Sequence, residues 1–393
     1  MFSIACLLGQ ACSNSGGEVE PDVEIEEILA EAWARPIPEV DVSGVVSYGF
    51  EVLSDDQAVM ARMSSPQSCL PNSPCGVIVL VAETGEAGLT RFEDYPSEAL
   101  AALTGKIVVR YNPVGTGIGA NLSEGEIDYG GRTDQDVLKD IITAMDMKAQ
   151  VDGEDIGLVS FGSGLIPASG AIARFQDTNL NCRYLVDVEG ETNRCFSTQA
   201  PFTIDPDGDH INMDGASDVT FSRCDFDLTS RMDKFPAGTS SGGKGEDGTP
   251  NSYICNEFAF PLKQTGRTCG DDPWWAEREA KNYLPLMEVH YQRLQFKHDH
   301  KQPTRYASRE ALYWVTKESK YLSYRLNMAP LNKAMTLLSE TQLEDSGVYL
   351  DIHGIGNGLG SGIFDKVGDF SRVSVEEFFV VILPDYIKGI PND

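Results

Sequence analysis

Positive charge is scarce in this chain. It carries 31 Lys and Arg residues against 60 Asp and Glu residues, which gives a formal net charge of −29 over 393 residues. Nucleic acids and anionic membrane surfaces are themselves polyanions, so this balance excludes both as electrostatic partners. The composition is instead that of a soluble, acidic protein that could bind cations or a small-molecule or peptide ligand.

Long hydrophobic runs are also missing. Beyond the first residues, no segment reaches the ~18 uninterrupted apolar residues that a membrane-spanning helix requires. The start of the chain, MFSIACLLGQAC, is apolar and is followed by the small polar spacer 13–17. This start resembles the end of a bacterial lipoprotein signal with Cys12 as the acylated residue, and a frayed apolar terminus is the alternative. We therefore expect an exported protein that meets the membrane only through an N-terminal lipid anchor.

No pair of cysteines has the CxxC spacing of a zinc site. Two of the nine cysteines lie in the leader, and the other seven are Cys69, Cys75, Cys182, Cys195, Cys224, Cys255 and Cys269. In an exported chain, disulfide bonds are the expected use of such cysteines. An odd number leaves one thiol unpaired unless Cys12 also pairs, and the connectivity cannot be deduced from the sequence.

Changes in composition divide the chain into five parts. Residues 18–40 are acidic and end in a Pro-rich turn, as in a tether. Residues 191–270 have few apolar runs and four of the cysteines, which indicates a disulfide-supported insertion or lid. The expected parts are a leader and spacer (1–17), the tether (18–40), a first core segment (41–190), the insertion (191–270) and a second core segment (271–393).

Within the two core segments, short apolar runs alternate with segments of helical periodicity. The run 76–82, GVIVLVA, is apolar throughout, as expected for a strand that is covered on both faces. We expect strands at 41–54, 58–64, 76–82, 106–111, 156–160, 183–188, 289–296 and 321–326. We expect helices at 96–103, 134–147, 165–175, 272–288 and 308–316, while 375–387 could be helix or strand. This alternation predicts an α/β fold with a doubly wound, mostly parallel sheet.

The stretch 156–175 has the pattern of a strand that turns directly into a helix. Such a turn needs small residues, because the two backbones nearly touch, and it strains the central residue so that its side chain stands above the sheet. The pattern of small, any, nucleophile, any, small residue maps onto Ser160, Phe161, Gly162, Ser163 and Gly164. Glycine therefore stands where a nucleophile is expected.

Over residues 45–387 the chain resembles the α/β-hydrolase superfamily. The features that carry the resemblance are the strand 76–82 before a small-residue loop, the stretch Tyr111-Asn-Pro-Val-Gly-Thr-Gly, the turn at 160–164 and His298-Asp-His after a late strand. The stretch Asp187-Val-Glu-Gly190 is similar to bacterial dienelactone-hydrolase-like or peptidase-like members. The resemblance implies a nucleophile elbow at 160–164 and hydrolysis of ester or amide bonds without a cofactor.

The resemblance also implies roles for individual residues. In family order the acid would be Asp299 and the base His353, with Asp187 or Glu189 as rival acids. The oxyanion loop would be Glu83-Thr84-Gly85, with the Ser163 backbone N–H as the second donor. The nucleophile could only be Ser163, one position beyond Gly162.

That shift of one position conflicts with the steric pattern, because it puts Phe161 and Leu165 where small residues are needed. Two interpretations follow. Either the protein is an exported serine hydrolase with Ser163, Asp299 and His353, or it is a catalytically inactive hydrolase-like surface protein that binds a partner or has a structural role. Its substrate and oligomeric state cannot be predicted from the sequence.

Two further segments invite a functional interpretation. Residues 205–214, DPDGDHINMD, place Asp205, Asp207, Asp209 and Asp214 around a Gly turn, as in the opening of a calcium loop. No Glu closes the loop at its twelfth position, so a solvated acidic loop is the alternative. Trp274 and Trp275 at the start of the expected helix 272–288 are interpreted as a hydrophobic plug rather than a ligand-stacking pair.

Overall fold

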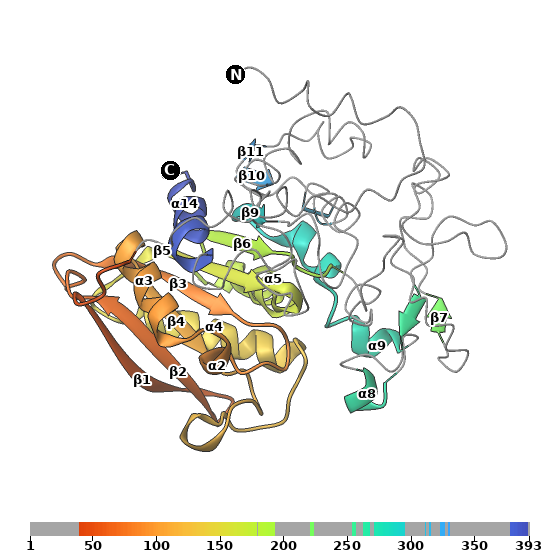
Figure 1. The fold of residues 1–393 in the computed structure, drawn as a ribbon. Helices are drawn as coiled ribbons and strands as arrows, with labels where there is room; N and C mark the ends of the chain where they lie inside the picture. Colours follow the sequence, from red (N-terminus) through yellow and green to blue (C-terminus); the bar gives the residue numbers. More distant parts are fainter. Residues whose placement is uncertain are drawn as a thin grey trace, which may run out of the picture. The chain divides into compact units, whose positions relative to one another are not determined.

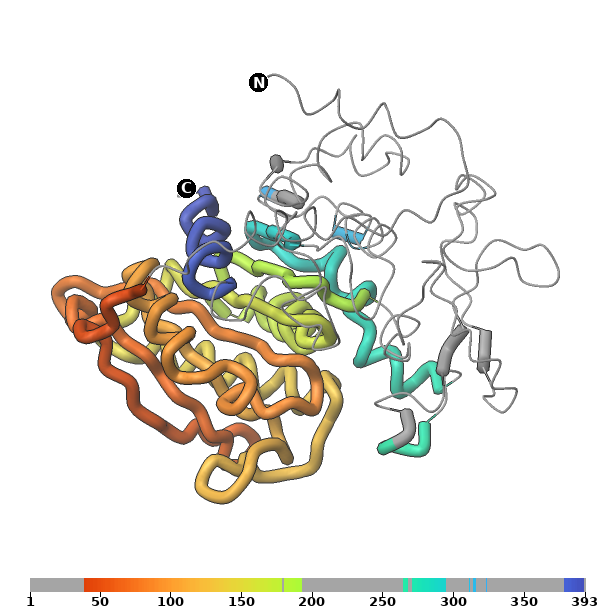
Figure 2. The backbone as a smooth tube through the Cα atoms, in the orientation of Figure 1, coloured from red at the N-terminus to blue at the C-terminus, as the bar shows by residue number. Residues whose placement is uncertain are grey.

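The computed structural model describes a defined set of residues, all within Ile37–Asp393 (Figures 1 and 2). They are 39–178, 180–192, 221–223, 254–256, 262–267, 271–294, 311, 314–315, 323–326, 329–330 and 378–391. The expected leader, nearly all of the tether and most of the insertion lie outside these residues.

A nine-stranded sheet forms the centre, in the order β1-β2-β4-β3-β5-β6-β9-β10-β11 (Figure 1). The strands are β1 Val45–Ser54, β2 Gln57–Pro66, β3 Cys75–Val81, β4 Ile107–Tyr111, β5 Val151–Phe161, β6 Tyr184–Val188, β9 His290–Leu294, β10 Ser323–Leu326 and β11 Ala329–Pro330. Strands β4, β3, β5, β6, β9 and β10 are parallel, whereas β1, β2 and β11 pair in antiparallel fashion. The expected fold class, a doubly wound and mostly parallel α/β sheet, is confirmed. A separate pair, β7 Phe221–Arg223 and β8 Ile254–Asn256, is antiparallel.

Helices cover both faces of the sheet. The helices are α2 Gly88–Arg91, α3 Asp94–Thr104, α4 Arg132–Asp146, α5 Leu165–Phe175, α8 Leu262–Thr265, α9 Asp272–Trp275 and α14 Leu383–Lys388. Single turns of 3-10 helix occur at Gly119–Asn121, Gly162–Gly164, Gln176–Thr178, Ala280–Asn282 and Leu284–Leu286, and a π-helical turn spans Phe378–Ile382.

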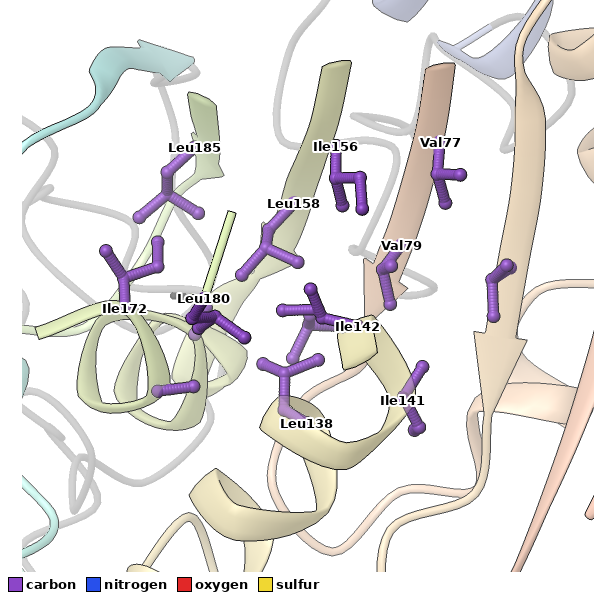
Figure 3. Close-up of a cluster of buried hydrophobic side chains, with 14 of the residues drawn as sticks. Val77, Val79, Leu138, Ile141, Ile142, Ile156, Leu158, Ile172, Leu180 and Leu185 are labelled. Atoms are coloured by element: carbon purple, nitrogen blue, oxygen red, sulfur yellow. The ribbon is translucent and has the colours of Figure 1, made fainter. Parts of the chain in front are cut away.

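Strand side chains alternate between two cores because successive residues of a strand point to opposite faces. On one face, Val77 and Val79 of β3 pack with Leu138 of α4 and Ile172 of α5 (Figure 3). On the other face, the intervening β3 residue Ile78 packs with residues of α3 and of the C-terminal helical segment. Continuous apolar strands therefore follow from burial on both sides.

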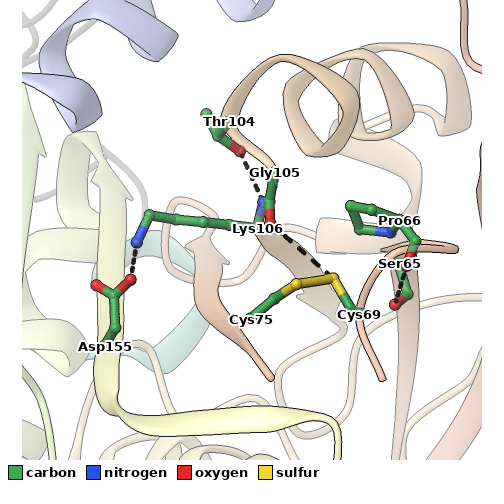
Figure 4. Close-up of a disulfide and its surroundings, with 8 residues drawn as sticks. All are labelled: Ser65, Pro66, Cys69, Cys75, Thr104, Gly105, Lys106 and Asp155. Carbon is green, nitrogen blue, oxygen red and sulfur yellow. Dashed lines mark hydrogen bonds and ion pairs between the residues drawn. A yellow bond between two sulfur atoms is a disulfide. The ribbon is translucent and has the colours of Figure 1, made fainter. Parts of the chain in front are cut away.

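A disulfide bond joins Cys69 to Cys75, the first residue of β3 (Figure 4). The sequence predicted disulfides without their connectivity, and this pair confirms the expectation for two of the cysteines. Cys182 is a free thiol, and burial raises its pKa to about 12, so it stays protonated and unreactive at neutral pH.

One expectation about the elements after residue 270 is wrong, and the structure bears on three others. Residues 272–288 are not one helix, because Pro285 supplies no backbone donor and Glu279 is extended, with φ −125° and ψ 117°. The strand expected at 321–326 is present as β10. The ambiguous segment 375–387 is helical from Phe378 onwards. Of the expected helix at 308–316, residues 311, 314 and 315 are described, and they are helical.

None of the helices in the described ranges combines the length and the apolar character needed to cross a membrane. This finding concerns those ranges and leaves the lipid-anchor expectation untested.

Candidate functional site

The candidate site lies where β5 passes into α5. β5 ends at the extended residue Phe161, Gly162–Gly164 form a single 3-10 turn, and α5 starts at Leu165. Gly162 has φ +49°, a left-handed conformation that side chains other than glycine's rarely adopt without strain. The strand, turn and helix expected from the sequence are therefore present, and the strained residue is Gly162.

Gly164 is required by close backbone contact. A Cβ atom at Gly164 would lie 2.7 Å from the Val81 carbonyl oxygen and closer still to that of Ala82. Because these are backbone atoms of the neighbouring strand end, they cannot rotate away as a flexible side chain could. The need for a small residue at this position, predicted from the sequence, has a direct steric cause.

Gly162 faces an acidic side chain instead. A Cβ atom at Gly162 would lie 2.9 Å from Cδ and 3.1 Å from Oε1 of Glu83. Glu83 lies two positions beyond the end of β3 and is 8% exposed. The space in which a side chain at position 162 would begin is therefore bordered by the Glu83 carboxyl group.

Ser163 is held by Thr84, from the loop after β3. Its Oγ accepts hydrogen bonds from the Thr84 backbone N–H and from the Thr84 hydroxyl, both at 3.0 Å. Ser163 is 7% exposed. The loop itself turns through Gly85, which has φ +80°, and the Glu86 N–H donates to the Glu83 carbonyl at 3.0 Å. The structure thus brings together Ser163, Thr84 and Gly85, which the sequence had assigned to one site.

Ser160 lies on the sheet face that packs against α5 and α4. It is fully buried and its Oγ has no hydrogen-bond partner. Its neighbours across the sheet are Val81 on one side and Asp187 on the other. A buried hydroxyl here cannot reach a ligand above the sheet edge, so Ser160 contributes its small size to the turn.

Asp187 is tied into a buried polar cluster at the end of β6. Arg293 pairs with it at 2.5 Å, the Tyr291 hydroxyl donates to it, and the Gly190 N–H donates to Oδ1 at 2.7 Å. Burial by itself would lower the pKa of the Arg293 guanidinium, but the Asp187 carboxylate and Tyr291 raise it above its ordinary value. The Arg293 guanidinium therefore stays charged in this buried position.

The segment after β6 also approaches the turn. Glu189 has φ +53°, which is uncommon for a residue with a side chain, and its N–H donates to the Leu294 carbonyl at 2.9 Å. The Glu191 N–H donates to the Gly162 carbonyl at 3.4 Å. This segment was noted in the sequence as Asp187-Val-Glu-Gly190, but the role of Arg293 was missed. The sequence feature that could have indicated this role is the single arginine within the expected strand 289–296.

The other predicted site residues lie outside the described ranges. These are Asp299 and His353, and the four residues Asp205, Asp207, Asp209 and Asp214 of the calcium-loop prediction, which stays a prediction. His290 is the one histidine in the described ranges. It is the first residue of β9, so it lies at the opposite end of the sheet from Ser163. Its Nδ1 is 2.8 Å from Oγ of Ser323, the first residue of β10. No group of three potential metal ligands converges within those ranges.

Comparison with known proteins gives structural likeness only. No protein-family model and no curated protein matches the chain. A thermostable esterase from Pseudomonas putida is 12% identical over 86% of this chain and 92% of its own, with a TM-score of 0.42. An acylaminoacyl peptidase from Pyrococcus horikoshii is 14% identical over 72% and 37%, with a TM-score of 0.42. A puromycin-hydrolyzing peptidase from Mycobacterium tuberculosis is 14% identical over 82% and 41%, with a TM-score of 0.45. This chain spans less than half the length of either peptidase.

Proposed function

We propose that this chain is an α/β-hydrolase-fold protein that binds a ligand or partner without hydrolysing it by a serine mechanism. The fold assignment rests on the parallel sheet with helices on both faces and on the small-residue turn from β5 into α5. A turn of this kind at the carboxyl end of a central strand is the location of the nucleophile in that superfamily. Fold alone does not determine function, so the functional part of the proposal depends on the turn itself.

The observation that carries the proposal is the conformation of Gly162. In a nucleophile elbow, the residue with strained, positive φ is the one whose side chain attacks the substrate. Here that residue has φ +49° and no side chain. The adjacent Ser163 is the middle residue of the 3-10 turn that leads into α5. It is almost fully buried, and its hydroxyl is hydrogen-bonded to Thr84. This favours loss of the nucleophile over its displacement by one residue.

The surroundings of Asp187 support the same interpretation. A catalytic acid orients the base histidine through a carboxylate oxygen that faces it. The described contacts of Asp187 occupy Oδ2 with Arg293 and Tyr291, and Oδ1 with the Gly190 N–H. A carboxylate with these three donors has a structural role, which disfavours Asp187 as a substitute acid.

A fluorophosphonate probe tests this proposal directly, because it labels activated serines only. The full-length protein should remain unlabelled and should show no more ester hydrolysis than its Ser163→Ala variant. Labelling of the parent protein that disappears in Ser163→Ala would overturn the proposal. The Ser160→Ala variant is a matched control, since it removes a buried hydroxyl from the same turn.

Restoring the nucleophile provides the complementary test. A serine at position 162 would meet Glu83, so the replacement should be made both alone and together with Glu83→Ala. If the remaining catalytic residues are intact, labelling should appear in the double variant and be weaker in Gly162→Ser alone. The double variant Gly162→Ala with Glu83→Ala is the control. It opens the same space but carries no hydroxyl at position 162, so it should remain unlabelled.

A serine hydrolase with Ser163 as nucleophile is the second candidate. One observation favours it: Ser163 Oγ accepts two hydrogen bonds from Thr84, and two donors would stabilise an alkoxide. However, the Thr84 N–H is also the expected oxyanion donor, and it cannot serve the nucleophile and the oxyanion at once. This candidate requires Asp299 and His353 as acid and base. Loss of probe labelling in His353→Ala as well as in Ser163→Ala would support it.

We further propose that the protein is exported and lipid-anchored through Cys12. The Cys69–Cys75 disulfide supports an oxidising compartment, because such bonds are rare in the reducing cytosol. Metabolic labelling with a palmitate analogue should modify the parent protein and not a Cys12→Ser variant. Equal labelling of the two proteins, or of neither, would contradict the anchor and leave the proposal about the elbow unaffected.

A further inference from the structure

A short loop before α4 lies between the candidate site and two acidic residues, Asp128 and Asp134. The loop is Asp128-Tyr129-Gly130-Gly131, called here the 128–131 loop, and it leads directly into α4. A Cβ atom at Gly130 would lie 2.8 Å from Thr84 Cγ2 and 3.2 Å from Ile166 Cγ2. Gly130 therefore packs against the threonine that holds Ser163 and against the first turn of α5. The loop therefore lies in direct contact with the residue that holds Ser163.

Two carboxylates hold this loop. Asp128 accepts hydrogen bonds from the backbone N–H groups of Thr133 at 2.8 Å and Asp134 at 3.4 Å, so it binds the first turn of α4. Asp134 reaches back in the opposite direction, and its Oδ2 accepts the Gly130 N–H at 2.7 Å. The Asp134 side chain thus fixes the same glycine that packs against Thr84.

Only one of the two carboxylates has a cationic partner. Arg278 pairs with the Asp128 carboxylate, donates from Nε to the Asp128 carbonyl at 2.9 Å and stacks on Trp274, with its Cζ 4.5 Å from the ring centroid. Its Nη1 donates to the Trp274 carbonyl at 3.0 Å. Asp134 is 2% exposed and forms no ion pair with any cation among the described residues. An ionised Asp134 would place a second negative charge beside Asp128 in a dry environment.

The charged and titratable groups around Asp134 determine when it ionises. The pKa of Asp134 is raised to about 7: burial and, after it, the Asp128 carboxylate raise it, while the Gly130 N–H, Arg278 and Val114 lower it in part. On the sheet side, the Tyr111 phenol stays neutral, since burial and then Asp134 raise its own pKa. Asp134 is therefore the group in this cluster that changes charge near neutral pH.

We propose that Asp134 is a pH-dependent latch on the 128–131 loop, closed when its carboxyl group is neutral and loosened when it is ionised. The neutral carboxyl group keeps the Gly130 N–H bond without repelling Asp128. The ionised form is repelled by Asp128 and gains hydration if the loop moves outward, which frees Gly130 from Thr84. The latch thereby regulates how firmly Thr84 holds Ser163. This holds both for a turn that only binds a ligand and for one that hydrolyses it.

The direction of the effect on stability follows from linkage. The pKa of Asp134 is about 7 in the folded protein, above its ordinary value near 3.8, so folding favours the protonated form. Its contribution is fully present below the ordinary value and is lost as the pH rises through about 7. The loop should therefore be best protected below the ordinary pKa near 3.8, lose protection as the pH rises to about 7, and show no further loss above that.

Hydrogen–deuterium exchange of the full chain measures this protection. After correction for intrinsic exchange, the peptides covering residues 82–86 and 126–136 should lose protection by up to about ten-fold for each pH unit between the ordinary pKa near 3.8 and the folded-state pKa of about 7, and no further above it. The Asp134→Asn variant keeps an acceptor for the Gly130 N–H and should remove this pH dependence. The Asp140→Asn variant makes the same change on the same helix, away from the loop, and should behave as the parent.

Equal pH dependence in the parent and in Asp134→Asn would overturn the latch. If Asp134→Asn fails to fold, the parent protein alone still decides. With 13C-labelled aspartate and 15N-labelled glycine, one carboxyl group should titrate near neutral pH with the same midpoint as the Gly130 amide. Absence of such a carboxyl group, or an unchanged Gly130 amide signal, would also overturn the proposal.

Discussion

The two ends of the central strands treat charge differently. At the amino end, Asp155 of β5 binds Lys106 and Arg183, and these three side chains are 17–21% exposed. At the carboxyl end, Asp187 of β6 binds Arg293, and both side chains are 0% exposed. Water reaches the first group and is excluded from the second.

The difference indicates which ion pairs can lose a partner with little loss of stability. A charge that water can reach loses little when its partner is removed, because water replaces the partner. A charge in a dry environment has no such replacement, so its pairing must be complete. The candidate site lies at the carboxyl end. The geometry of that end depends on buried pairs such as Asp187 and Arg293, which a single substitution would break.

Removing Arg293 should produce the largest effect. The Arg293→Met variant leaves the Asp187 carboxylate buried without its cation and should lower the free energy of unfolding by about 3–5 kcal/mol. Urea unfolding followed by circular dichroism measures this. The double variant Asp187→Asn with Arg293→Met should recover part of the loss. A single variant as stable as the parent would show that the buried pair is not what fixes this end.

A methyl group at Gly164 should rank second. The Gly164→Ala variant forces Cβ against the carbonyl oxygens of Val81 and Ala82, and overpacking of this kind typically costs about 1–3 kcal/mol in well-packed cores. Thermal unfolding of Gly105→Ala gives the comparison, since that glycine has φ +68° but no atoms near its Cβ position. If Gly105→Ala is the more damaging of the two, backbone conformation and not close contact decides the need for glycine.

The disulfide at the amino end should rank third. Cys69 and Cys75 are six positions apart, and closing so short a loop stabilises the folded state by about 2 kcal/mol in the chain-entropy account. Thermal unfolding of the Cys69→Ala, Cys75→Ala double variant checks this value. Adding a reductant to the parent should reproduce the loss and should leave the variant unchanged; a variant that still responds to the reductant would point to another disulfide.

Removing Arg183 should have the smallest effect. The Arg183→Met variant makes the same substitution as at Arg293, but it acts on an ion pair that water can reach. It should lower the free energy of unfolding by no more than about 1 kcal/mol, and less at high salt. An effect equal to that of Arg293→Met would remove the distinction between the two ends of the sheet.

Local sequence determined much of the framework. The continuous apolar run fixed β3, because strands covered on both faces are typically apolar throughout. The small residues from Ser160 to Gly164 determined the tight turn into α5 and placed the strained conformation at Gly162, where only glycine is tolerated without cost. These features depend on neighbours within a few positions, which periodicity and turn chemistry can report.

Tertiary structure alone decided the rest. Asp187 and Arg293 are 106 positions apart and meet only because β6 and β9 are neighbours in the sheet. The disulfide partner of Cys69, the approach of Glu83 to Gly162 and the bonds from Thr84 to Ser163 likewise depend on which chain segments pack together. The bond from Gln135 of α4 to the Glu277 carbonyl, at 2.9 Å, is a further long-range contact of this kind. Long-range pairing is set by burial of the whole sheet, and no local pattern encodes it.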